Sequence, residues 1–276
     1  MASLATDECT TQKLNVYGPV SLNVTSREFR LLQLYPGSLE ARIECALRIF
    51  SFDDDYPDYD ALSYTWGTKA SQKYIHVNDQ RFGIAENLHR VLLRLRSHIY
   101  SRWLWIDAIC INQDDFQERI KQVQVMRNIN IYASACQTVV WLGEAEWNSE
   151  SAMELLRLVR TGGIQELSKL KKRSPDQYVR SHHALASFFR RAWWTRVWII
   201  QELALSKEDP LMMCGSVSMP WSVMVKAVAH VERVKQFVVH SSPEFEDFEN
   251  LQLLWRNNVL LLDSIRKATQ TGRSVR

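Results

Sequence analysis

The stretch "RWLWIDAICINQDDFQERIKQVQVMRNINIYASACQTVVWLG", residues 102–143, decides the fold class. Its beginning, 102–110, is an apolar run with the length of a buried strand. Its middle, 114–135, has apolar residues at helical spacing along one face, namely Ile120, Val123, Met126 and Ile129. Its end, "TVVWLG" at 138–143, is a second buried strand. Strand, helix and strand in this order predict an α/β fold with a mostly parallel sheet flanked by helices.

Shorter elements are predicted ahead of this stretch. Alternating or continuous apolar residues indicate strands, and Pro-Gly or Asn-Asp pairs indicate turns. The elements are a strand at 27–37 with its hairpin partner at 43–52, a strand at 59–64, a hairpin at 73–84 that turns at Asn78 and Asp79, and a helix at 85–98.

The second half of the chain is predicted to be mostly helical. The elements are a helix that begins near Ser149, an exposed basic excursion at 162–177, an aromatic-rich helical segment at 182–206, and a strand at 210–221 leading into a helix near Trp221. We divide the chain into an N-terminal lead-in at 1–27, a main domain at 28–221 and a C-terminal helical extension at 222–276.

Composition excludes several classes of protein. The net charge of +3 combines 34 basic with 31 acidic residues, a balance that argues against nucleic acid as the main partner. Residues 1–20 lack the apolar core of a signal peptide, and no apolar run has the length of a membrane span. The five cysteines form no C-x-x-C pair, which fits a reducing compartment. We therefore expect a cytoplasmic protein.

Two predicted strands end in side chains suited to binding a ligand. Open α/β sheets bind ligands beyond the carboxyl ends of their strands. The stretch "YDALSYTWG" at 59–67 ends in Tyr64, Trp66 and Gly67, where an indole can stack on a flat ring and glycine allows close approach. Asp107 follows the next buried strand and either meets a ligand hydroxyl or caps a turn. The alternative for Trp66 is a tryptophan at the edge of the core.

Glu202 is the most informative carboxylate of the sequence. On a continuous helix its neighbours three and four positions away include no basic residue, and it extends an aromatic stripe through Trp198. Such a carboxylate either forms a tertiary salt bridge, for example with Arg191 or Arg196, or faces a cavity. Glu118 contrasts with it, because Asp115 is placed to form a capping box with it and Lys121 follows one turn later.

Several familiar chemistries find no support. The sequence contains no G-x-x-x-x-G-K-[ST], G-x-G-x-x-G or G-x-S-x-G motif, and its histidines lack metal-binding spacing. Cys110 stands at a predicted strand end, but no histidine is placed by sequence to activate it. We interpret it as a buried structural thiol, and we predict no metal site and no cofactor.

Three blocks together resemble the heterokaryon-incompatibility (HET) domain of filamentous fungi. They are "YDALSYTWG" at 59–67, residues 103–143, and "RRAWWTRVWIIQELALS" at 190–206. The resemblance covers roughly residues 28–221 and departs from the family pattern at "NINIYASA", where the family has less insertion. It implies a role in nonself recognition, in which fusion of incompatible cells triggers regulated cell death.

Two stretches within these blocks are remotely similar to Toll/interleukin-1 receptor (TIR) domains, which have a flavodoxin-like sheet. "YDALSYTWG" at 59–67 is similar to the first TIR strand and the loop that follows it. "WIIQEL" at 198–203 has the W-x-x-x-E-L spacing of a helix whose glutamate cleaves NAD in plant TIR domains. The resemblance implies that Glu202 is catalytic for hydrolysis of the nicotinamide–ribose bond, with NAD as substrate. Tyr64, Trp66, Gly67, Asp107 and Trp198 then become the expected substrate contacts.

Two other functions stay open. One is a non-enzymatic adaptor that signals by self-association, with Glu202 in an ion pair. The other is a short regulator or decoy of longer HET proteins, because no sensor module follows the matched region. The expected partners are accordingly a second copy of the chain or other nonself-recognition proteins.

Overall fold

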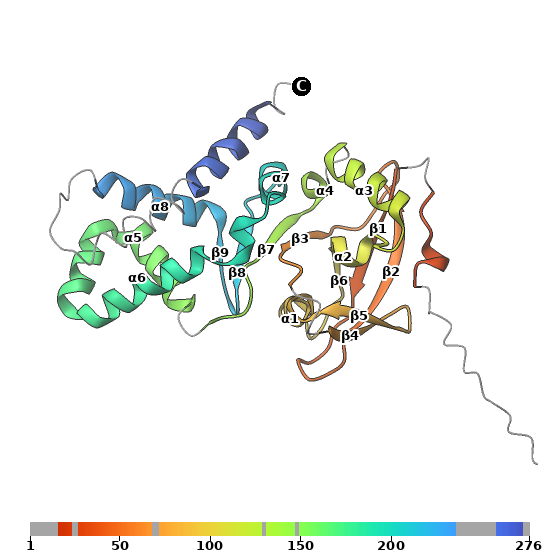
Figure 1. Ribbon diagram of the computed structural model, residues 1–276, viewed down its shortest axis with the longest axis horizontal. Helices are drawn as coiled ribbons and strands as arrows, with labels where there is room; N and C mark the ends of the chain where they lie inside the picture. The colour runs from red at the N-terminus through yellow and green to blue at the C-terminus, as the bar shows by residue number, and fades with distance from the viewer. Residues whose placement is uncertain are drawn as a thin grey trace, which may run out of the picture.

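A computed structural model describes residues 16–23, 27–67, 72–128, 131–146, 149–235 and 258–272 of the 276-residue chain. These residues form the predicted α/β fold, which is built around a nine-stranded sheet. The strand order is β5-β4-β2-β1-β6-β3-β7-β8-β9. Figure 1 shows α5, α6 and α8 gathered near the β8–β9 end of the sheet, while α1 to α4 lie about the rest of it.

The strands are short, and most have one or both faces buried. They are β1 (Glu28–Leu34), β2 (Glu44–Ser51), β3 (Asp60–Tyr64), β4 (Gln72–Val77), β5 (Gln80–Ala85), β6 (Arg102–Trp105), β7 (Gln137–Trp141), β8 (Leu211–Cys214) and β9 (Val217–Pro220).

The helices range from one turn to seven. They are α1 (Glu86–Leu95), α2 (Asp107–Cys110), α3 (Phe116–Asn128), α4 (Ile131–Ser134), α5 (Ser149–Arg173), α6 (Pro175–Phe189), α7 (Ile199–Leu205), α8 (Trp221–Lys235) and a last helix over 258–272, with 3₁₀ turns η1 (Gly18–Val20) and η2 (Ala192–Thr195).

The sheet is mixed rather than mostly parallel, which corrects the expected topology. β3 is parallel to β6 and β7, β7 to β8, and β2 to β4. The pairs β1–β2, β1–β6, β4–β5 and β8–β9 are antiparallel. Three of these antiparallel pairs join consecutive strands, and a short connection between paired strands forces them to run antiparallel. The parallel centre, β6-β3-β7-β8, is the part that resembles a doubly wound fold.

Several predicted elements are confirmed. β1 and β2 form the N-terminal hairpin, and β4 and β5 turn at Asn78 and Asp79, whose φ values of 50° and 62° suit a tight hairpin turn. α1 lies within the helix predicted at 85–98, α5 begins at Ser149, and α8 begins at Trp221. Asp115 caps α3, since its Oδ1 accepts from the backbone N–H of residues 117 and 118 at 2.9 and 3.0 Å.

Other boundaries were wrong in ways that have physical causes. The strand predicted at 102–110 ends at Trp105, and residues 107–110 form the single turn α2. The excursion predicted at 162–177 is helical, because Leu167 and Leu170 pack partly against the core and this spacing outweighs the basic composition. Gly163, with φ +58°, kinks α5 there.

The predicted elements 114–135 and 210–221 also divide. α3 and α4 lie within the first, where Ile120 is 43% exposed and the side chains of Val123, Met126 and Ile129 fall outside the described part of the structure. The second is a hairpin of β8 and β9 with Gly215 at φ +56° in its turn.

Two apolar clusters stabilise the fold. The first fills the space around β1 to β7 and α1, and includes the fully buried Trp105 and Trp141. The second joins α5, α6 and α8 to β8 and β9, and contains Trp193 and Trp221. The helix over 258–272 adds Val259 and Leu262 to this second cluster. The predicted division of the chain at 221 and 222 stays a prediction.

Two absences hold for the described ranges. None of the helices there is both long and apolar enough to cross a membrane. The same residues contain no group of three or more His, Cys, Asp or Glu side chains arranged to hold a metal ion.

Candidate functional site

Residues Tyr64–Gly67, which are the last residue of β3 and the loop that follows it, border two hollows at the carboxyl ends of the central parallel strands. The larger, of about 1180 Å³, is lined by Tyr64, Trp66 and Gly67 on one side, and we call it the aromatic groove. The smaller, of about 590 Å³, is lined by Thr65 and three arginines, and we call it the arginine hollow. Alternate residues of an extended chain point to opposite sides, which explains how one short loop borders both.

Asn87 of α1 holds this loop in place. Its Nδ2 donates to the Thr65 carbonyl at 2.6 Å, and its Oδ1 accepts from Trp141 Nε1 at 2.9 Å. Tyr64 is 2% exposed, whereas Trp66 is 44% exposed. Gly67 has φ +78°, a left-handed conformation that favours glycine. The indole of Trp66 therefore lies at the surface beside the groove rather than in the core.

Asp107 meets Trp66 from the first turn of α2. Trp66 Nε1 donates to Asp107 Oδ2 at 2.8 Å, and the Ala108 N–H donates to Oδ1 at 2.7 Å. Withdrawal from water raises the pKa of Asp107 from 3.8 to about 6, with Glu202 adding to the rise and the bond from Trp66 opposing it. The structure thus brings Asp107 into contact with Trp66, next to Tyr64 and Gly67. Asp107 also accepts an N–H of the first turn of α2, and it is not among the described residues that line the groove.

Glu202 of α7 is 3% exposed and engaged by three donors. Arg196 donates from Nη2 to Oε1 at 2.8 Å and from Nη1 to Oε2 at 3.0 Å, and the Ser63 hydroxyl donates to Oε2. Trp193 Nε1 donates in turn to Ser63 Oγ at 2.8 Å. Among the described residues that line the two hollows, Glu202 is absent. Its carboxylate forms an ion pair with Arg196 in the packed interior next to β3.

The tertiary salt bridge considered for Glu202 is therefore present, with Arg196 as its partner. The segment predicted as helical at 182–206 is interrupted: α6 ends at Phe189 and α7 begins at Ile199. Because the backbone between these two helices is not helical, the Arg196 side chain can contact Glu202, six positions further along the chain. On a continuous helix only residues three or four positions apart are neighbours, so the sequence analysis did not find this pair among the helical neighbours of Glu202.

Trp198 occupies the N-cap position of α7 and is 42% exposed. Its carbonyl accepts the N–H groups of Gln201 and Glu202 at 3.0 and 3.1 Å. It does not belong to the described lining of the aromatic groove. Trp198 and Glu202 thus stand apart from Tyr64, Trp66 and Gly67, which line the groove, while Asp107 contacts Trp66.

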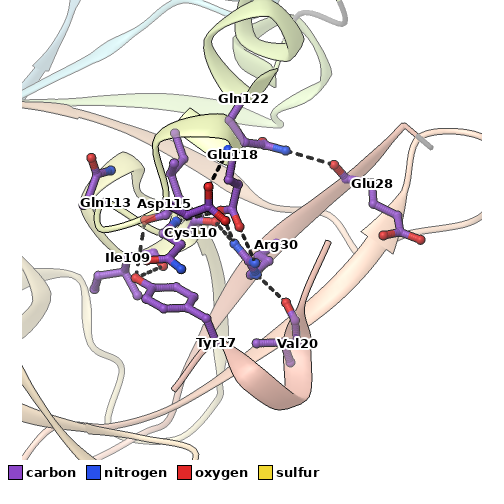
Figure 2. Close-up of polar contacts among 12 residues, drawn as sticks. Tyr17, Val20, Glu28, Arg30, Ile109, Cys110, Gln113, Asp115, Glu118 and Gln122 are labelled. Carbon is purple, nitrogen blue, oxygen red and sulfur yellow. Dashed lines mark hydrogen bonds and ion pairs between the residues drawn. The ribbon is translucent and has the colours of Figure 1, made fainter. Parts of the chain in front are cut away.

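A buried arginine on β1 is a feature that sequence reasoning missed. The Arg30 side chain is 0% exposed and forms a two-point ion pair with Glu118 at 2.6 and 2.9 Å (Figure 2). Arg30 also donates to the carbonyls of Val20 and Cys110, and it lies 5.0 Å from the centre of the Tyr17 ring. The sequence feature that could have revealed this buried arginine is its position between the apolar residues Phe29 and Leu31 of a predicted strand.

This network corrects the local explanation of Glu118. Its carboxylate accepts from Arg30 and from the Asn112 N–H at 2.7 Å, so it links α3 to β1 and to the loop before the helix. Tyr17, which lines the aromatic groove, donates its hydroxyl to the Ile109 carbonyl at 3.1 Å (Figure 2). The network therefore holds the N-terminal segment against one wall of the groove.

Cys110 is buried, as interpreted from the sequence. Its side chain is 1% exposed, and burial raises the pKa of the thiol to about 12. A thiol protonated at neutral pH is a poor nucleophile.

Comparison with known proteins identifies one family. The profile of the family described as "Heterokaryon incompatibility protein (HET)" matches residues 59–202, a span that runs from the residue before β3 to Glu202. The chain is 33% identical over 254 residues to "Heterokaryon incompatibility protein 6, OR allele" of Neurospora crassa, an alignment that covers 77% of this chain and 37% of that protein. No solved structure matches.

Proposed function

Because this chain belongs to the heterokaryon incompatibility (HET) family, we propose that it acts in nonself recognition between fungal individuals and promotes regulated cell death when incompatible cells fuse. The family match over residues 59–202 carries the proposal, and the likeness to a Neurospora heterokaryon incompatibility protein supports it. The chain spans 37% of the length of that relative, so the relative's own partners and activity are not transferred.

The geometry favours a signalling module that works without Glu202 as a catalyst. A carboxylate that stabilises a reaction must face the substrate, and Glu202 instead faces Arg196 and Ser63 in the interior. In this proposal the Arg196–Glu202 pair ties α7 to β3 and the domain signals by associating with a second copy or with another nonself-recognition protein.

Expression in a filamentous fungus tests the proposed function. Induction of the chain is expected to arrest growth and permeabilise hyphae, as measured by uptake of a vital dye. Leu62→Asp places a charge at a position that is 1% exposed in β3 and serves as the misfolded control. Growth that is unimpaired at a level of soluble protein equal to that of a lethal relative would contradict the proposal.

A second candidate function is cleavage of NAD at the nicotinamide–ribose bond. The observation that favours it is the aromatic groove, where exposed Trp66 borders a space large enough for a nucleotide; the Trp66 indole donates to Asp107, whose pKa burial raises to about 6. The bond between C1′ and the nicotinamide nitrogen breaks with its electron pair on nicotinamide. A water oxygen bonds to C1′ and passes its proton to Asp107. Glu202 would take part only after separating from Arg196.

Release of nicotinamide separates the two candidates. Purified chain is incubated with NAD across a concentration series, and its mass in solution is measured by light scattering at each concentration. The signalling module predicts concentration-dependent association without nicotinamide. The hydrolase predicts nicotinamide release that is lost in Asp107→Asn and retained in Glu154→Gln, a control carboxylate that is 73% exposed on α5. Activity unchanged in Asp107→Asn would exclude the proton transfer described above.

A further inference from the structure

The arginine hollow lies where an open α/β sheet places its ligands. Its walls come from the loop after β3, from the start of α1 and from residues that follow β7 and α6. β3 and β7 are parallel neighbours, so their carboxyl ends meet at the same edge. A volume of about 590 Å³ falls within the range of small-molecule sites.

Several hydrogen-bond donors that line the arginine hollow are available to a ligand. Among the residues that the structure describes, the exposed guanidinium of Arg190 has no hydrogen bond or ion pair, and neither does the hydroxyl of Thr65. Arg90 is paired only at the surface, with Glu86 at 2.7 Å. These three side chains come from three separate segments and line one hollow.

Arg191 supplies the buried part of the site. Its side chain is 8% exposed and donates to the carbonyls of Leu142 and Glu144 at 2.8 and 3.0 Å and to Ser149 Oγ at 2.7 Å. Its Nε–H is buried and has no partner within the described structure. Because solvent does not reach this N–H, Arg191 contributes a fixed positive charge beside the hollow rather than a free donor within it.

The acidic side chains of the hollow do not cancel these donors. Glu144 accepts from Arg94 at 2.9 Å, and Glu146 is 71% exposed and 3.9 Å from Arg191. Gly143 has φ +104°, and a Cβ there would lie 3.0 Å from Arg191 Nη1. The glycine thus leaves room for the guanidinium to approach the backbone at the end of β7.

We propose that the arginine hollow binds the phosphate group of a small phosphorylated molecule, with Arg190, Arg90 and Thr65 as its donors and the buried guanidinium of Arg191 as a fixed positive charge beside them. Guanidinium groups match the planar pairs of oxygens on phosphate, and a hydroxyl adds a third direction. The site goes beyond the proposed function, because neither signalling nor NAD cleavage as argued above uses it.

Isothermal titration with inorganic phosphate tests the site at constant ionic strength, with AMP and adenosine as further probes. Phosphate is expected to bind the wild-type chain, and Arg190→Gln is expected to weaken binding about tenfold, since a charge-assisted hydrogen bond is lost. Arg180→Gln on α6 makes the same change of charge at an exposed position outside the hollow and is expected to leave binding unchanged. AMP is expected to bind at least as tightly as phosphate.

Three results would overturn the proposal. They are the absence of phosphate binding to the wild-type chain, equal weakening in Arg190→Gln and Arg180→Gln, and adenosine binding as tight as that of AMP. Thr65→Val, which keeps the shape of the side chain, provides a second variant if Arg190→Gln unfolds at a lower temperature. A negative result here leaves the fungal growth assay unaffected, so the failures of the two proposals are distinguishable.

Discussion

Replacing Glu202 by glutamine is expected to destabilise the fold even though the side chain keeps its size. Both oxygens of the native carboxylate accept hydrogen bonds, from Arg196 on one side and from Arg196 and Ser63 on the other. Glutamine replaces one oxygen by an NH₂ group, which then faces a donor. The positive charge of Arg196 also loses its counter-ion inside the protein.

The expected magnitude follows from the burial of the two partners. Removing one member of a buried ion pair costs about 3–5 kcal/mol. The Arg196 side chain keeps 17% of its exposure, so water partly replaces the lost partner, and we expect the lower end, about 3 kcal/mol. For a chain of this length that corresponds to a decrease in Tm of about 6 °C or more.

Urea unfolding followed by tryptophan fluorescence measures this free energy. Trp193 reports on the same region because its Nε1 donates to Ser63. The matched control, Glu154→Gln, is expected to lie within about 0.5 kcal/mol of the wild type. Equal stability of Glu202→Gln and wild type would refute the structural role of the pair and restore the case for a residue kept for catalysis.

Three further predictions concern the two hollows. The pKa of Asp107 is raised to about 6 in the folded state, so its contribution to stability is present below pH 4 and is lost as pH rises to about 6; Asp107→Asn is expected to flatten this part of the stability profile measured by thermal unfolding. Trp66→Phe removes the hydrogen bond that lowers the Asp107 pKa and is expected to move it above 6 in a ¹³C NMR titration, with an unmoved pKa as the contrary result. Gly143→Ala is expected to cost about 1–3 kcal/mol in urea unfolding because of its positive φ and the closeness of Arg191, whereas Gly272→Ala, which meets nothing within 4 Å, is expected to be neutral; equal effects would refute this reasoning.

Local patterns predicted the elements whose neighbours are close in sequence. The turn at Asn78 and Asp79 and the cap at Asp115 follow from backbone chemistry within a few residues, and the structure confirms them. The sheet is mixed mainly because three hairpins add antiparallel pairs to it, and the sequence predicted two of these hairpins, β1–β2 and β4–β5. The antiparallel pairing of β1 with β6 was not predicted, because the two strands lie far apart in the sequence. The spacing of apolar residues within a strand does not indicate which distant strand will pair with it.

The candidate site was predicted in part for the same reason. The positions of Trp66 after β3 and of Asp107 after β6 followed from the rule for strand ends. The structure shows a hydrogen bond between them, and their role in binding a ligand stays a prediction. The salt bridge of Glu202 depends on the break between α6, which ends at Phe189, and α7, which begins at Ile199. The sequence did not predict this break, because the apolar residues across it keep helical spacing. The partner of Arg30 lies 88 positions away, where only the fold brings it near.

The loop Tyr64–Gly67 has a consequence for any ligand of this domain. These four residues line both the aromatic groove and the arginine hollow, with Tyr64, Trp66 and Gly67 facing the first and Thr65 facing the second. Asn87 holds this segment through the Thr65 carbonyl at 2.6 Å and through Trp141 at 2.9 Å, so the shapes of both hollows depend on one amide side chain.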